Sequence, residues 1–68
     1  MKIISGKNMV KILEGKGWYL DHIRGSHYIM KKGNINFSIT VPVHGNKDLK
    51  LGTQISIMKT ANLNEKDL

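Results

Sequence analysis

The most informative part of the chain is residues 27–41, which read HYIMKKGNINFSITV. From Ile35 to Val41 apolar and polar residues alternate strictly, which predicts a strand with one buried and one solvent-facing side. His27 to Lys32 predicts the strand before it, and Gly33-Asn34 predicts a tight hairpin turn between the two. Pro42 has no N–H to donate to a neighbouring strand, so we expect it to end the second of these strands.

The length of the turn determines which side chains of this hairpin share a face, because opposed residues lie on the same side of a sheet. A two-residue turn places His27 and Lys31 on the uncovered, polar face, while Tyr28 and Met30 lie under the helices. A turn longer by one residue would reverse the two faces. The expected opposed pairs are Lys32 with Ile35, Met30 with Phe37, and Tyr28 with Ile39.

Helices are predicted on both sides of the strands. Ser5 is a favourable N-cap, and apolar residues follow it at helical spacing until Gly15, which predicts a helix over about residues 6–15. A second helix is expected over about residues 51–61, where apolar residues again recur at helical spacing and Asn62 can cap the end in the left-handed conformation.

Trp18 to Ile23 is rich in aromatic and β-branched residues and predicts the first strand, joined to the next by a three-residue turn at Arg24-Gly25-Ser26. Residues 43–50 predict a polar loop, and the charged residues 64–68 predict a frayed tail. The order of helix, three strands and helix predicts an α+β fold, in which both helices cover one face of a three-stranded antiparallel sheet.

Size and charge limit the function classes. A chain of 68 residues is one domain, residues 1–68, with an ordered core expected over about residues 5–63. Eleven Lys and Arg against five Asp and Glu give a net charge of +6, which favours a polyanionic partner, nucleic acid first, or reflects a protein that is merely cationic. The absence of cysteine excludes a disulfide framework and a thiolate metal site. No stretch resembles a signal peptide or a membrane span, so we expect a cytoplasmic protein without a membrane partner.

His27 is the main candidate for chemistry, because an exposed imidazole can take or give a proton near physiological pH. Gly25 before it lets a ligand backbone approach closely, and Ser26 offers a hydroxyl or a backbone N–H to a phosphate. Gly-Ser-His is a weak motif by itself, and the alternative is an ordinary surface histidine.

The other two histidines have different predicted places. His44 follows Pro42 at the end of the third strand, beside the start of the second, so we expect His44 and His27 to be neighbours, either at a shared phosphate site or with no joint role. His22 is expected to share a face with Trp18 near the edge of the core, in a structural role. No ligand spacing supports a three-histidine metal site, so neither a metal nor another cofactor is expected.

Basic side chains near these histidines can supply the positive field that an RNA phosphate chain needs. The candidates are Arg24 in the first turn, Lys31 in the second strand and Lys47 in the loop before the second helix. The alternative for each is an ordinary solvated surface charge.

Five short motifs follow one another along the chain: Ser5-Gly6-Lys7, Gly17-Trp18, Arg24-Gly25-Ser26-His27, Thr40-Val41-Pro42-Val43-His44 and Lys50-Leu51-Gly52-Thr53. As a set they resemble the HicA family of toxin–antitoxin systems, and the resemblance spans about residues 5–63. Two positions depart from the family pattern: Leu51 stands where many members have proline, and Asn8 replaces a usual glutamate. Both departures concern the starts of helices.

The resemblance implies a fold like that of the double-stranded-RNA-binding domain and the role of toxin in a type II toxin–antitoxin system. It also implies ribosome-independent cleavage of mRNA, suppressed by a HicB-like antitoxin protein. The family's catalytic histidine lies in its Gly-Ser-His motif, which is His27 here. We therefore expect a metal-independent endoribonuclease in which His27 takes a proton from a ribose 2′-hydroxyl, with His44 the best candidate for protonating the leaving group.

Two other functions stay open. One is a non-catalytic RNA-binding module of the same fold, in which His27 only contacts phosphate or ribose. The other is a small partner-binding protein whose charge serves a protein interface. RNA-binding modules usually carry exposed aromatic residues that stack on bases. Most aromatic residues of this chain are expected in the core, which favours the enzyme.

Overall fold

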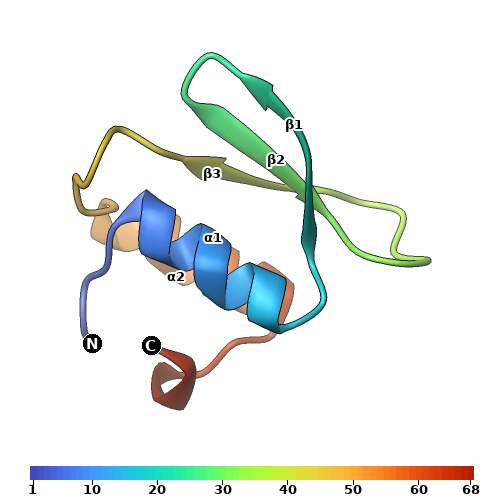
Figure 1. Cartoon of the computed structure of the whole chain (residues 1–68). Coiled ribbons are helices and arrows are strands. Elements are labelled where there is room, and N and C mark those ends of the chain that lie inside the picture. Colours follow the sequence, from blue (N-terminus) through green and yellow to red (C-terminus); the bar gives the residue numbers. More distant parts are fainter.

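A computed structural model describes all 68 residues. Its elements are α1 (Gly6–Gly15), β1 (Tyr19–Arg24), β2 (His27–Lys31), β3 (Ile39–Pro42), α2 (Leu51–Ala61) and the 3₁₀ helix η1 (Glu65–Asp67). The strands form one antiparallel sheet in the order β1-β2-β3, and both α-helices lie on the same side of it (Figure 1). The predicted α+β fold is therefore confirmed, together with both α-helix ranges.

Helix α1 begins where the sequence predicts because Ser5 caps it. The backbone N–H of Asn8 donates to the Ser5 hydroxyl oxygen at 3.0 Å, which satisfies one of the first-turn donors that have no partner within a helix. The helix then buries Met9, Val10 and Leu13, which are spaced to form one stripe. Because this stripe faces the sheet, the other side of α1 is left to solvent and carries its charged residues.

The core lies between the helices and the covered face of the sheet. The sheet contributes Met30, Ile39 and Val41, which are almost fully buried, and α2 contributes Ile57 and Met58. The complete set of buried apolar residues is Ile4, Met9, Val10, Leu13, Trp18, Met30, Ile39, Val41, Leu49, Ile57 and Met58. Every residue of β1 is exposed, so this strand is held mainly by its pairing with β2.

One polar side chain is fully buried within this core. Gln54 of α2 accepts a hydrogen bond from the N–H of Ile4 at 2.9 Å and donates one to the carbonyl of Lys2 at 2.7 Å. A second link follows at Leu49, whose N–H donates to the Ile4 carbonyl at 2.8 Å. These bonds tie the segment before α1 to the start of α2, and they satisfy polar groups that would be costly to bury alone.

The third strand is shorter than predicted, and its register differs. Strand β3 begins at Ile39, and Ile35 and Phe37 are exposed, although their alternation predicted burial. Tyr28 lies opposite Val41 and Met30 opposite Ile39, which shifts the predicted pairing by two residues. The predicted turn at Gly33-Asn34 does form, because the N–H of Ile35 donates to the Lys32 carbonyl at 2.9 Å, but residues 32–38 around it belong to neither strand. Since side chains alternate with a period of two, a shift of two leaves the faces unchanged.

We expected the third strand to end at Val41, but Pro42 also belongs to β3 and is its last residue. It lies opposite His27 of β2, and β3 is an edge strand, where a residue without an N–H is tolerated.

The first hairpin also differs from the prediction. Its turn has two residues, Gly25 and Ser26, and Arg24 belongs to β1 opposite His27. Gly25 has φ +61° at the first turn position, the left-handed conformation that glycine adopts without strain.

The tail predicted to fray is instead folded back on the protein. Residues 65–67 form η1, in which the Asn64 side chain accepts from the N–H of Lys66 and the Asp67 carboxylate accepts from the N–H of Asn64. Lys16 Nζ lies 2.8 Å from Asp67 Oδ1, and the hydrogen bond from Lys16 lowers the pKa of Asp67. Leu68 packs against the core, which gives this short helix an apolar anchor.

Helix α1 touches the backbone of β3 at Gly6. A Cβ atom built on Gly6 would overlap the carbonyl oxygen of Pro42, and Val43 lies directly behind it. Gly6 is needed here for its small size, because its φ is not in the left-handed region. The first turn of α1 and the end of β3 are therefore packed backbone against backbone.

We predict that Gly6→Ala destabilises the fold by about 1–3 kcal/mol, the usual cost of adding a methyl group where there is no room for it. The matched control is Gly15→Ala at the other end of α1, where an added Cβ meets nothing within 4 Å. That control should be neutral or stabilise the protein by up to ~1 kcal/mol, since alanine favours helix. Urea unfolding measures both, and a Gly6→Ala protein as stable as the parent would contradict the packing.

Candidate functional site

The open face of the sheet gathers basic and imidazole side chains at the end that holds the β1–β2 turn. Three of them, His22, Arg24 and His27, belong to this end, and Lys31 lies at the opposite end of β2. The register assigns to this face Tyr19, His22, Arg24, His27, Ile29, Lys31, Thr40 and Pro42. No helix covers this side (Figure 1), so a large ligand can reach it directly.

His27 is the first residue of the central strand, and its side chain is exposed. It stands between Arg24 on one neighbouring strand and Pro42 on the other. The preceding Ser26 is half-buried, and its carbonyl accepts from the N–H of Val43 at 2.8 Å. The turn that carries His27 is therefore fastened to both neighbouring strands. The predicted position of His27, on the uncovered polar face at the end of a strand, is confirmed.

His44 lies near the same end of the sheet but faces another space. The bond between Val43 and Ser26 brings the residue before His44 next to the residue before His27, as expected. The His44 side chain, however, lines a cavity of about 350 Å³ between the end of β3 and the start of α2, and His27 is not part of its lining. The structure thus separates the predicted residues into an open-face group and a cavity group that contains His44 and Lys47.

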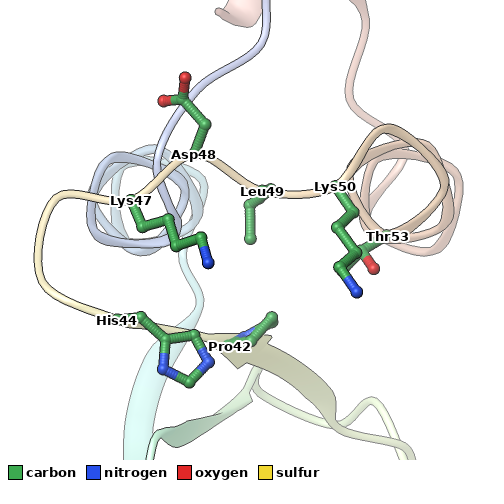
Figure 2. A pocket seen from close by; sticks show the side chains of 7 residues that line it. All are labelled: Pro42, His44, Lys47, Asp48, Leu49, Lys50 and Thr53. Atoms are coloured by element: carbon green, nitrogen blue, oxygen red, sulfur yellow. The ribbon is translucent and has the colours of Figure 1, made fainter.

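The cavity is basic. Lys47 points into it toward the His44 ring and Lys50 points into it from the start of α2, whereas Asp48 points away (Figure 2). Lys50 is also the N-cap of α2 and makes no side-chain capping bond, and the first turn of α2 holds no acidic residue. Free N–H groups at the start of a helix favour an anion. The residues that line the cavity are Pro42, His44, Lys47, Asp48, Leu49, Lys50 and Thr53.

The structure places His22 differently from the prediction. His22 is exposed on the open face, directly opposite Ile29, instead of lying with Trp18 at the edge of the core. Its Nδ1 is 2.8 Å from Oδ2 of Asp21, and Nζ of Lys31 is 3.7 Å from the same oxygen. The hydrogen bond from His22 lowers the pKa of Asp21, and the charge of Lys31 lowers it further.

A signal in the sequence could have located His22. Glycine at the first position of a two-residue turn is typical of the type II′ hairpin. Reading Gly25-Ser26 in this way pairs Arg24 with His27 and His22 with Ile29, as observed. The three-residue turn assumed from the sequence moved His22 to the wrong face, because an offset of one residue reverses a strand.

The aromatic residues are also less buried than expected. Only Trp18 is buried, while Tyr19 is 52% and Phe37 48% exposed. Tyr19 lies on the open face opposite Lys31, and Phe37 contacts Trp18 at the rim, with 6.2 Å between ring centroids. The expectation that most aromatic side chains lie in the core was therefore wrong, and it no longer argues against base stacking.

No group of three or more His, Asp or Glu side chains is placed so that it could hold a metal ion. Neither α-helix has the length and apolar surface that crossing a membrane requires.

The family model described as the HicA toxin of bacterial toxin–antitoxin matches residues 6–63, a range that contains both α-helices, all strands and both groups of site residues. No curated protein matches the chain.

We predict that Asp21 titrates below its ordinary pKa of 3.8 because His22 and Lys31 stabilise its charged form. The stabilisation that Asp21 gains from these partners is therefore present above its ordinary pKa of 3.8 and is lost as the pH falls through the lower pKa of the folded protein. Carbon-detected NMR titration of the carboxylates measures this directly.

In that titration His22→Ala should raise the pKa of Asp21 most, and Lys31→Met should raise it less, following the order of the two causes. Lys59→Met on α2 serves as the control and should leave Asp21 unchanged. If Asp21 titrates identically in the parent and in His22→Ala, the pair does not exist in solution.

Proposed function

The chain belongs to the HicA family of bacterial toxin–antitoxin toxins, and from this premise we propose that it is a ribosome-independent endoribonuclease that cleaves mRNA, with His27 as its catalytic base. The observation that carries the proposal is the place of His27. It is an exposed imidazole on the central strand of an uncovered sheet face, directly opposite the guanidinium-bearing Arg24. A base and a cation side by side suit the cleavage of a phosphodiester.

In the proposed reaction the neutral imidazole of His27 takes the proton of a ribose 2′-hydroxyl, and the 2′-oxygen attacks the adjacent phosphorus. Arg24 stabilises the negative charge that develops on the phosphate oxygens, and the Gly25-Ser26 turn lets the RNA backbone approach closely. The mechanism assigns every role to side chains and backbone groups, without a metal ion. Positioned acid–base catalysis contributes about 10²–10⁴-fold, so the enzyme should be slow.

The two groups of basic residues suit different parts of one RNA strand. Lys31 lies four residues beyond His27 on β2, roughly 13 Å away at ~3.3 Å per residue, which is far enough to contact a different phosphate. His44 and Lys47 line the basic cavity on the other side of Pro42 and suit a flanking phosphate there. We propose that the RNA spans from Lys31 across His27 toward this cavity.

An antitoxin partner follows from the family, and we propose that it is a HicB-like protein acting in the cytoplasm. The +6 toxin presents His27, Arg24 and Lys31 on one open face. A partner that is acidic where it docks on this face would shield His27 and compete with RNA for the same charges. Attraction between opposite charges would also speed the association.

A second function has support from one observation. Exposed Tyr19 and Phe37 are the kind of side chain on which RNA-binding modules stack unpaired bases. In a non-catalytic binding module of the same fold, His27 would contact RNA without cleaving it. The two functions make opposite predictions for replacement of His27. In the enzyme, the replacement removes RNA cleavage and leaves most of the RNA affinity. In the binding module there is no cleavage to lose, and the replacement lowers the RNA affinity.

We predict that His27→Ala lowers the rate of RNA cleavage by at least ~10²-fold, the usual contribution of a positioned base. Its thermal midpoint should stay close to that of the parent, because the side chain is exposed. Single-turnover cleavage of a single-stranded RNA, with a DNA copy of the same sequence, measures the rate and tests the need for the 2′-hydroxyl.

Lys59→Ala, which removes a cation from the far end of α2, is the control and should cleave as the parent does. A folded His27→Ala protein that cleaves RNA at the parental rate, or a parent that cuts the DNA copy, would refute the proposed mechanism. A parent that binds RNA and never cleaves it would favour the binding module.

We also predict that removal of divalent metal leaves cleavage unchanged. Protein dialysed against excess EDTA should cut the same RNA at the same rate, since His27 and Arg24 supply the proton transfer and the charge stabilisation. If EDTA stops the reaction and a divalent ion restores it, the histidines act as ligands instead of proton carriers. RNA structure also responds to divalent ions, so the substrate should be an unstructured oligonucleotide.

A further inference from the structure

His22 lies one diagonal step from His27 on the open face. It stands opposite Ile29, and His27 is two residues from Ile29 along the same strand. Diagonal neighbours of this kind are about 7–8 Å apart, within reach of two long side chains that share one ligand. Arg24 completes the group, because it is opposite His27 and two residues from His22 on β1. Two imidazoles and a guanidinium are therefore neighbours on the open face.

A β-bulge brings the Asp21 carboxylate next to His22. In a regular strand, consecutive side chains point to opposite faces, so Asp21 and His22 could not meet. The register of β1 against β2 shifts between Leu20 and His22, which removes Asp21 from the ladder. Asp21 then contacts both His22 Nδ1 and Lys31 Nζ, two side chains of the open face. Bulges often re-aim a side chain next to an active site.

The contact with Asp21 leaves one ring nitrogen of His22 free. Nδ1 donates to the Asp21 carboxylate at 2.8 Å, so Nε2 is the nitrogen that can act on a ligand. A carboxylate that holds an imidazole in this way fixes its tautomer and orientation. Exposed ion pairs contribute little to folding stability, so stability alone does not account for the arrangement.

We propose that His22 is a second catalytic residue, the general acid that protonates the leaving group, and that Asp21 is its positioning residue. This inference rests on the proposed RNA cleavage by His27. As the 2′-oxygen bonds to phosphorus and His27 accepts its proton, the bond from phosphorus to the 5′-oxygen breaks. The protonated His22 donates its Nε2 proton to that oxygen. The products are a 2′,3′-cyclic phosphate and a free 5′-hydroxyl.

The structure favours His22 over His44 for this role. His44 lines the cavity beyond Pro42, where Lys47 and Lys50 also converge, whereas His27 lies outside that cavity. Two lysine side chains and an imidazole in one hollow suit the binding of a phosphate. A leaving group needs its acid next to the scissile bond, and on the open face that residue is His22. Hence His44 binds substrate, and His22 completes the acid–base pair.

The test compares two substrates that differ only in the leaving group. One is the dinucleotide uridylyl-3′,5′-adenosine, whose departing 5′-oxygen needs a proton. The other is uridine 3′-(4-nitrophenyl phosphate), whose departing nitrophenolate is stable without one. Loss of a general acid should slow only the first substrate, while loss of the base slows both.

For His22→Ala we expect a loss of ~10²-fold or more on the dinucleotide and less than about threefold on the nitrophenyl ester. Asp21→Asn should show the same selectivity with a smaller loss, a pattern that a merely structural residue would not produce. His44→Ala is the matched control, and its losses on the two substrates should be equal. His27→Ala should lose activity on both.

Equal losses of His22→Ala on the two substrates, or no loss on the dinucleotide, would overturn the role of His22 and leave that of His27 intact. Parental activity in His27→Ala would instead overturn the proposed function itself. If His22→Ala fails to fold, His22→Gln supplies the same comparison, because its amide keeps a hydrogen bond to Asp21 but cannot donate a catalytic proton. Selectivity for the nitrophenyl ester in either folded variant supports the proposal.

Discussion

The close approach of Gly6 to the carbonyl of Pro42 is the contact on which the rest of the molecule depends. It seats the first turn of α1 on the end of β3, and Pro42 lies opposite His27 while also lining the basic cavity. One contact between two backbones thus sets the open face and the cavity relative to each other. Gln54 fixes the start of α1 as well, because its side chain bonds the segment before α1 to α2. A small domain with a thin core relies on such contacts more than a large one does.

The sequence predicted what short-range chemistry determines. Both α-helices begin and end as expected, because Ser5 caps one and Asn62 ends the other in the left-handed conformation. The prediction of the third strand was wrong over its first half. Alternation from Ile35 onward fits a strand pattern whether or not a partner strand is present. Burial there depends on how far the helices extend over the sheet, which no local pattern records. The faces were still correct, because the register error was an even number of residues.

For the candidate site, the sequence predicted that His27 lies on the open face beside the turn, because Gly25-Ser26-His27 is a continuous motif at the start of a strand. It placed His22 on the wrong face, because that face depends on the length of the turn. It predicted that His44 and His27 are neighbours and left open whether they share a phosphate site. Their backbones are indeed close. The His27 side chain lies on the open face, however, and the His44 side chain lines the cavity, a separation that only the three-dimensional structure shows.

The bulge at Asp21 has one more consequence, which concerns solubility. Strand β1 is exposed along its whole length, and its outer edge pairs with no other strand. A flat, regular edge of this kind is a template on which a second molecule can add a strand and begin to aggregate. The register shift breaks the regular spacing of N–H and C=O groups, and charged side chains beside it oppose close packing by another copy. The irregularity that brings Asp21 to an imidazole thus also makes the exposed edge a poorer template for other chains.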